Sequence, residues 1–296
     1  MAVVVAGASG FVGRALVARL VKGGRAVRAL SRSEGNPWGP TVKAVRWDPA
    51  DAQGAWRSEL KDAEAVINLC GENIAAGRWT AARKKAILDS RVDATTALAR
   101  ALPAGGVLVN VSAVGYYGAR GDEVLTESSA PGEGFLADVC RRWEKAATEN
   151  APAGARVVLA RLGVVLGPGG GALPRMALPF KLFAGGPVGD GKQWMPWVHL
   201  DDAVGALVHA AETKALSGPV NVVSPEAARN GDVSRALGAA LGRPCWLPAP
   251  AFAFKIALGE MSCLLLDSQR VEPAALHASG YRFARPLVYE ALKASF

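Results

Sequence analysis

Cysteine and histidine are scarce in this sequence, and long uninterrupted apolar runs are missing. Four cysteines and three histidines are scattered over 296 residues, a distribution that fits neither a disulfide framework nor a metal site. The first apolar run is interrupted by glycine at position 7, and no basic leader or cleavage site accompanies it. We therefore expect no metal, no membrane span and no targeting segment. The expected location is the cytoplasm, or an organelle stroma or matrix if a targeting peptide has been removed.

The charge is unbalanced without being concentrated. Lysine and arginine number 34 against 26 aspartates and glutamates, a net charge of +8. The basic residues are dispersed, and no platform of alternating basic and aromatic residues is present. An anionic cofactor and an anionic small-molecule substrate explain the excess at least as well. We expect a small-molecule substrate and no nucleic-acid partner.

Apolar strand patterns alternate with helical patterns through the first half of the chain. This alternation is typical of right-handed βαβ units, and it predicts an α/β fold with a doubly wound parallel Rossmann sheet. We expect an NADP-binding domain over 1–165 and a smaller C-terminal substrate lobe over 166–296, with 198–223 rejoining the sheet. The expected strands cover 2–6, 26–30, 42–47, 63–69, 107–112, 156–161 and 220–223, and the expected helices 11–22, 80–102 and 134–150.

A glycine-rich turn follows the first strand at once and opens the first helix. Gly7 permits the tight turn, Gly10 lets a phosphate approach the backbone, and Gly13 lets helix and sheet pack closely. Free N–H groups and the helix dipole at this point favour an anion. A glycine triplet between a strand and a helix therefore predicts a site for the diphosphate of a dinucleotide.

The end of the second strand indicates which dinucleotide is bound. Proteins that bind NAD place an acidic residue here, whereas this chain has Ser31 and Arg32, with no carboxylate before Glu34. An arginine matches the 2′-phosphate of NADP through charge-assisted hydrogen bonds, which predicts NADP as the cofactor. Arg14 can contribute to the same pocket. The alternative is that Arg32 is a solvated turn residue.

Several strings resemble one family. The turn and the strands that follow it resemble the extended and atypical short-chain dehydrogenases/reductases. More narrowly, the chain is similar to the nucleoside-diphosphate-sugar-epimerase-like family that carries its own short C-terminal domain. The strings that carry the resemblance are Gly71-Glu-Asn-Ile, Ser112-Ala-Val-Gly-Tyr-Tyr-Gly118, 135–144, 185–194 and Trp197-Val-His-Leu-Asp-Asp202.

The resemblance implies an NADP-binding Rossmann fold and a set of cofactor positions. Most of these are backbone roles, so an ordinary strand end is compatible with each one taken singly. The implied set is Gly7, Ser9, Gly10, Phe11 and Val12 for the diphosphate, Ser31 and Arg32 for the adenosine phosphate, Leu69, Cys70 and Gly71 on the ribose side, and Leu162, Gly163 and Val164 near the nicotinamide. Gly13 and Arg14 join the expected cofactor residues from their places at the turn.

The catalytic pair of short-chain dehydrogenases is absent. In that superfamily a Tyr-x-x-x-Lys pair follows the fifth strand, and the lysine lowers the pKa of the tyrosine. Helix register from Glu144 puts Leu136 and Cys140 in these places, and neither side chain can do that work. A true Tyr-x-x-x-Lys at 289–293 lies near the end of the chain, where we interpret it as a coincidence.

Other polar and aromatic residues are candidates for the chemistry. Tyr117, Tyr116 and Ser112 are the candidate catalytic residues, with Arg120 and Arg161 as electrostatic helpers, and the alternative for the two tyrosines is packing and loop anchoring. Gln193, Trp194 and Trp197 are the candidate substrate residues, with core packing as the alternative for one tryptophan. His199 is interpreted as a structural histidine beside Asp201, and Cys140 as a buried, inert thiol rather than a reactive one.

Two functions remain open. One is an NADP-dependent oxidoreductase or sugar-nucleotide-type epimerase whose proton transfer has moved off the lost pair. The other is a catalytically silent NADP-binding regulator or scaffold, including a role in cell division or in an organelle complex. Extended relatives often dimerise through two packed helices, an analogy that suggests a homodimer.

Overall fold

A parallel sheet of seven strands forms the centre of the computed structural model, which describes residues 2–32 and 35–296. The strands lie in the order β11-β7-β5-β4-β1-β2-β3, and each neighbouring pair is parallel. The sequence-based prediction of a doubly wound Rossmann sheet is confirmed. The strands are β1 (Ala2–Ala6), β2 (Ala26–Ser31), β3 (Val42–Arg46), β4 (Ala63–Asn68), β5 (Val107–Ala113), β7 (Arg156–Leu162) and β11 (Gly218–Val222).

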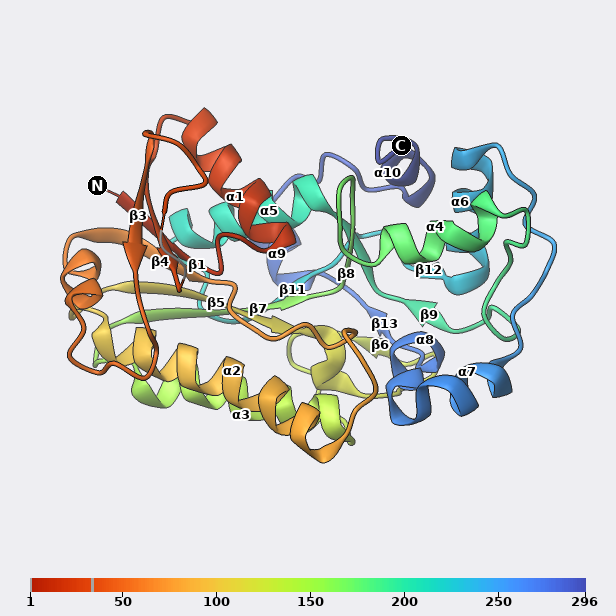
Figure 1. Cartoon of the computed structure of the whole chain (residues 1–296), viewed down its shortest axis with the longest axis horizontal. Coiled ribbons are helices and arrows are strands. Elements are labelled where there is room, and N and C mark those ends of the chain that lie inside the picture. Colours follow the sequence, from red (N-terminus) through yellow and green to blue (C-terminus); the bar gives the residue numbers. More distant parts are fainter. Residues whose placement is uncertain (1, 33–34) are drawn as a thin grey trace.

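Helices cover both faces of the sheet, as Figure 1 shows. On one face lie α1 (Phe11–Lys22) and α5 (Leu200–Glu212), and on the other lie α2 (Ala81–Ala101) and α3 (Phe135–Asn150). The strand β1 is buried throughout, with Val3 and Val5 in the core beneath α1 and α5 and Val4 in the core beneath α2. Alternate side chains of a strand point to opposite faces, so one run of β-branched residues serves both cores.

A smaller lobe occupies the side of the molecule beyond the carboxyl ends of the strands (Figure 1). Its core joins Phe180, Trp197 and Leu237 from three different elements. Three pairs of short strands connect the lobe to itself and to the sheet: β8 (Val164–Leu166) with β10 (Trp197–His199), β9 (Trp194–Met195) with β12 (Ala228–Arg229), and β6 (Val124–Leu125) with β13 (Arg270–Val271).

The helices of the lobe are short. They are α4 (Leu173–Lys181), α6 (Asn230–Leu241), α7 (Ala251–Leu258), α8 (Cys263–Leu266), α9 (Ala274–Ala278) and α10 (Val288–Lys293), and the 3-10 turns of the chain are η1 (Ala55–Leu60), η2 (Val114–Tyr117) and η3 (Gly259–Ser262). No helix in the described parts of the chain is both long and apolar enough to cross a bilayer. The division at 165 and 166 stays a prediction, although β11 does pair with β7 at the edge of the main sheet.

Candidate functional site

The turn between β1 and α1 is built so closely that two positions require glycine. Gly7 has φ +78°, and a Cβ there would lie 2.7 Å from the carbonyl carbon of Leu69. A Cβ on Gly13 would lie 2.2 Å from the carbonyl oxygen of Gly7. Gly10 is the N-cap of α1, and no side chain among the described residues caps it. The N–H groups of the first turn of α1 therefore have no side-chain cap, as an anion site needs.

The residues around this turn hold it in place. The Arg14 guanidinium donates a hydrogen bond to the Ser9 carbonyl oxygen at 2.7 Å, so it closes the exposed side of the turn. Phe11 contacts the loop that follows β8: its ring lies so close to Gly170 that a Cβ there would be only 2.6 Å away. Ser9 is exposed, whereas Phe11 and Val12 are half-buried. The turn thus touches both the sheet and the smaller lobe.

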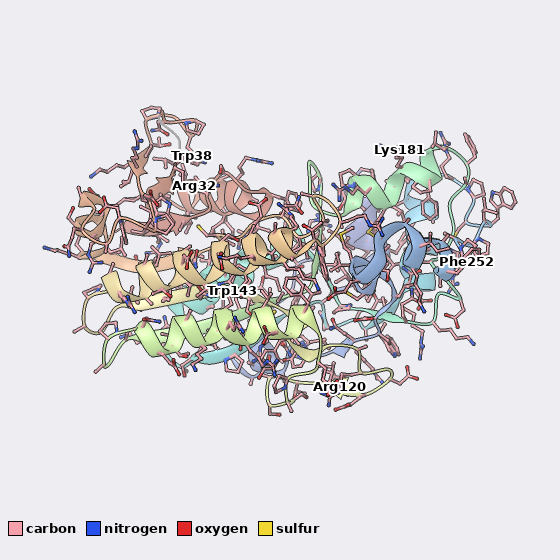
Figure 2. The ribbon with its side chains drawn as sticks, turned by 60° about the horizontal axis from the view of Figure 1, so that its bottom comes forward. Arg32, Trp38, Arg120, Trp143, Lys181 and Phe252 are labelled. Atoms are coloured by element: carbon pink, nitrogen blue, oxygen red, sulfur yellow. The ribbon has the colours of Figure 1, made fainter. Side chains whose placement is uncertain are left out.

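The adenosine end of the expected site lies at the end of β2. Ser31 ends the strand and Arg32 follows it with an exposed side chain, beside α1 and far from the part of the lobe that carries Lys181 and Phe252 (Figure 2). Burial raises the pKa of the Cys70 thiol to about 12, and the charge of Arg32 offsets part of this rise. The guanidinium therefore lies within electrostatic reach of the end of β4. Glu34 lies outside the described residues.

The remaining expected cofactor positions lie at the ends of β4 and β7. The Leu69 N–H donates to the Ala6 carbonyl at 2.9 Å, which brings the segment after β4 beside the glycine turn. Gly163 is packed against the Pro196 carbonyl, which would be 2.6 Å from an added Cβ. Because the carboxyl ends of parallel strands meet at one edge, the structure brings residues 7–14, 31–32, 69–71 and 162–164 to a single edge.

A buried polar network lies beneath the end of β5. The Ser112 hydroxyl donates to Glu144 Oε1 at 2.7 Å, and Arg161 donates to both Glu144 oxygens at 2.8 Å. Arg161 also donates to the Tyr117 hydroxyl at 2.9 Å, and that hydroxyl donates to Asn221 Oδ1 at 2.7 Å. Burial disfavours the charge of Arg161, but the Glu144 carboxylate outweighs this effect and raises the pKa of the guanidinium. The network joins β5, β7, β11 and α3.

Two of the three expected catalytic residues are enclosed by the protein. Tyr117 is completely buried, and its hydroxyl is engaged by Arg161 and Asn221. Burial raises the pKa of this hydroxyl. Ser112 is also buried and bonded to Glu144. These contacts match the alternative of packing for Tyr117, and their partners come from strands and a helix distant in sequence.

Tyr116 differs from its neighbour because it is half-buried. The Arg161 guanidinium carbon lies 3.5 Å from its ring centroid, and its ring meets that of Tyr117 edge-on at 5.4 Å. A cation over an aromatic ring is a stabilising contact. Arg120, the other expected helper, is paired instead with Glu123 at 2.6 Å.

Leu136 and Cys140 flank the turn that follows β5. A Cβ on Gly115 would lie 3.3 Å from Leu136 Cβ and 3.9 Å from Cys140 Sγ. Burial raises the pKa of the Cys140 thiol to about 12, with a further rise from Glu144, so the group is a neutral thiol near pH 7. The thiol donates to the Ala113 carbonyl at 3.6 Å. Neither side chain offers an acid or a base at neutral pH.

The expected substrate residues separate into three environments. Gln193 donates to the carbonyls of Val188 and Leu265, so its amide holds the lobe together. Trp197 is buried and donates to the Glu226 carbonyl, which matches the alternative of core packing for one tryptophan. Trp194 is half-buried. The guanidinium carbons of Arg229 and Arg270 lie 4.2 and 5.1 Å from its ring centroid.

His199 caps a helix. Its Nδ1 accepts a hydrogen bond from the Asp201 N–H at 3.2 Å at the start of α5, and burial lowers the pKa of the imidazole. Among the described residues, no group of three or more histidine, cysteine and acidic side chains is placed to hold a metal ion. The sequence analysis did not identify Glu144 as part of the buried network, because helical periodicity marks it only as a helix residue.

A glycine turn at the carboxyl edge of a parallel sheet, followed by a helix with an open N-terminus, defines a dinucleotide-binding protein of the Rossmann class. Residues 3–223 match the NAD dependent epimerase/dehydratase family, and residues 249–295 match a domain of unknown function, DUF1731. The chain belongs to the NAD dependent epimerase/dehydratase family.

The chain is also similar to individual members over its whole length. It is 42% identical to the epimerase family protein MT2273 of Mycobacterium tuberculosis, over 98% of this chain and 96% of that protein. It is 39% identical to the chloroplastic SDR39U1 homolog of Arabidopsis thaliana, over 99% of this chain and 86% of that protein. The crystal structure of human epimerase family protein SDR39U1 with NADPH matches with a TM-score of 0.90 and 37% identity, covering 100% of this chain and 99% of that one.

Proposed function

We propose that the protein binds NADP(H) across the carboxyl edge of its sheet. The observation that carries this proposal is the turn at Gly7, Gly10 and Gly13, where Cβ atoms on Gly7 and Gly13 would collide with the neighbouring backbone. The open N-terminus of α1 suits the diphosphate, and Arg32 suits the 2′-phosphate. The human relative crystallised with NADPH supports the same assignment.

The bound cofactor supplies a hydride donor or acceptor at its nicotinamide. The chain itself holds the diphosphate with the backbone of residues 7–13 and the adenosine phosphate with Ser31 and Arg32. Residues 69–71 and 162–164 line the remainder of the crevice, mainly with backbone groups. Tight packing of Gly163 against Pro196 keeps that wall rigid.

The test of cofactor choice uses Arg32→Asp with Lys22→Asp as its matched control. Both variants make the same charge change, but the exposed Lys22 lies at the opposite end of α1. Since hydrogen bonds to charged groups contribute about 1.5–3 kcal/mol, R32D should weaken NADPH binding by about ten- to a hundredfold and leave NADH binding unchanged or improved. Unchanged NADPH affinity in R32D, or an equal loss of affinity in K22D, would refute the assignment of Arg32 to the 2′-phosphate.

For the reaction, we propose an NADP(H)-dependent oxidoreductase or epimerase-type enzyme that acts on a small anionic substrate without the Tyr-x-x-x-Lys pair. Trp194, with Arg229 and Arg270 beside its ring, is the proposed substrate contact. The Nε of Arg270 is buried without a partner among the described residues, which suits an incoming anion. Tyr116 is the proposed proton donor, since Tyr117 and Ser112 are buried.

Turnover of NADPH with a panel of carbonyl compounds and nucleotide sugars tests this proposal. Tyr116→Phe should lower any measured turnover by about 10²-fold or more, the usual contribution of general acid–base catalysis. Turnover that survives in Y116F removes the tyrosine from the reaction.

The second candidate is an NADP(H)-binding regulator or scaffold without turnover, including a role in cell division or in an organelle complex. Leu136 and Cys140 favour it: they lie beside the turn after β5, where the resemblance places the catalytic pair, and one is apolar and the other a neutral thiol. Tight NADPH binding with no turnover on the panel would favour this candidate. All four cysteines are free, which supports a reducing compartment such as the cytoplasm or an organelle stroma or matrix.

A further inference from the structure

Arg91 is a half-buried arginine of α2 that the proposed function does not use. One of its guanidinium nitrogens, Nη1, donates to the carbonyls of Glu72 and Ile87, each at 3.0 Å. The group also lies over the Trp143 ring, with its carbon 5.1 Å from the centroid. Figure 2 shows Trp143 where α3 runs alongside α2. The guanidinium is therefore held in one position by two neighbouring helices and the segment after β4.

The Trp143 side chain, over which Arg91 lies, is itself fixed by hydrogen bonds. The Trp143 indole donates to the Thr95 hydroxyl at 2.8 Å, one helical turn beyond Arg91. Asn68, the last residue of β4, donates to the same hydroxyl at 2.9 Å and to Asn110 at 2.7 Å. These contacts tie α2 and α3 to the carboxyl ends of β4 and β5. These hydrogen bonds thus fix the position of Arg91 relative to the carboxyl edge of the sheet, where the cofactor is proposed to bind.

The other edge of the guanidinium lies against Gly71, in the segment that follows β4. A Cβ on Gly71 would lie 3.2 Å from Nη2 and 3.3 Å from Nε of Arg91. No described residue accepts a hydrogen bond from either nitrogen, and the neighbouring Glu72 carboxylate is paired with Arg83 at 2.9 Å. Arg91 also lies within electrostatic reach of Cys140. A partly desolvated cation therefore keeps two donors free toward the end of β4.

A dinucleotide on this fold crosses the point at which the strand order reverses, here between β1 and β4. Arg32, after β2, marks the adenosine half, so the nicotinamide half lies over β4 and β5. We propose that Arg91 binds the nicotinamide-side ribose hydroxyls through its free guanidinium edge and supplies, from α2, the positive charge that Cys140 cannot supply from α3. This inference rests on the proposed NADP(H) binding.

The test compares NADPH with 2′,5′-ADP, a fragment that carries the adenosine and its 2′-phosphate but no nicotinamide half. Arg91→Gln keeps a donor for the Glu72 carbonyl and removes the charge. Because hydrogen bonds to charged groups contribute about 1.5–3 kcal/mol, R91Q should weaken NADPH binding about tenfold or more and leave the 2′,5′-ADP affinity unchanged. Calorimetry or NADPH fluorescence measures both affinities without any turnover.

Two further variants complete the design. Arg100→Gln on the same helix, where Arg100 is exposed and bonded to Asn150, should change neither affinity. Arg91→Lys keeps the charge but offers one donor centre, so it should lose about threefold for NADPH only. Thermal unfolding is recorded for every variant, and R91K decides the question alone if R91Q does not fold.

The outcomes separate this inference from the proposed function. Absence of NADPH binding in the unmodified protein overturns the proposed function. If NADPH binds and R32D weakens both ligands, but R91Q or R91K leaves NADPH affinity unchanged, the assignment of Arg91 alone is overturned. Equal weakening of both ligands in the Arg91 variants also overturns it, because a contact to the nicotinamide half cannot affect the fragment.

Discussion

Removing the Glu144 charge should destabilise the protein more than any surface charge change on the same helix. Glu144 and Arg161 form a bidentate pair with N–O distances of 2.8 Å, and their side chains are only 9% and 4% exposed. The Ser112 hydroxyl completes the set at 2.7 Å. Glu144→Gln keeps the shape and an acceptor for Ser112 but leaves the Arg161 charge buried without a counter-ion.

The magnitude follows from the cost of an uncompensated buried charge. Breaking a buried pair by removing one partner costs about 3–5 kcal/mol. With an unfolding entropy of about 2.1 cal/mol/K per residue, a chain of 296 residues should lose about 5–8 °C in Tm. Arg161 also holds the Tyr117 hydroxyl and lies over the Tyr116 ring, so the loss spreads to the turn after β5.

Thermal and urea unfolding followed by circular dichroism measure this effect. The matched control is Asp138→Asn, which removes a carboxylate from the same helix, where it pairs with Arg141 and Arg142 at the surface. Exposed pairs contribute about 1 kcal/mol or less, so D138N should shift Tm by about 2 °C at most. Equal shifts in E144Q and D138N would refute the reasoning that burial makes the Glu144 pair important.

Three other changes test the site and its support. Gly13→Ala places a Cβ 2.2 Å from the Gly7 carbonyl oxygen, so it should destabilise the turn by about 1–3 kcal/mol and abolish measurable NADPH binding in a fluorescence titration. Tyr117→Phe leaves buried groups of Arg161 and Asn221 without a partner and should lower the free energy of unfolding by about 1–3 kcal/mol in urea, with NADPH affinity unchanged. Burial lowers the pKa of His199 in the folded state, so its contribution to stability is present above the unfolded value of about 6.5 and is lost as the pH falls through the folded pKa. His199→Asn keeps an N-cap acceptor without a titrating group, and its Tm should fall less than that of the unmodified protein between pH 7 and pH 5.

For each of these three predictions, one outcome would contradict the structural argument. Retained NADPH binding in G13A would mean that the turn is not the diphosphate site. A weaker NADPH affinity in Y117F at unchanged stability would mean that Tyr117 contacts the cofactor. If Tm falls equally in H199N and in the unmodified protein between pH 7 and pH 5, another group controls stability in this range.

Local sequence signals account for the main sheet and for half of the site. The alternation of apolar strands and helices recurs at short range, and the observed β1 to β5, α1, α2 and α3 follow it closely. The close approach at Gly13 is also local, because Gly7 lies six positions away, whereas the close approach at Gly7 involves Leu69 at the end of another strand. The short pairs β6 with β13 and β9 with β12 were not foreseen, since each is two residues long and its partner lies far along the chain.

The sequence by itself determined the Rossmann architecture, the glycine turn and the arginine at the end of the second strand, because each depends on neighbours within one strand–turn–helix unit. Only the tertiary structure decided which polar side chains are free for chemistry. Tyr117 is engaged by Asn221, 104 positions away, and Arg91 is positioned by Glu72 and by Trp143 of another helix. Burial and hydrogen bonding depend on contacts between segments that are distant in sequence. No local pattern can therefore reveal that the Tyr117 hydroxyl is buried and paired while Arg91 keeps two donor nitrogens without a partner among the described residues.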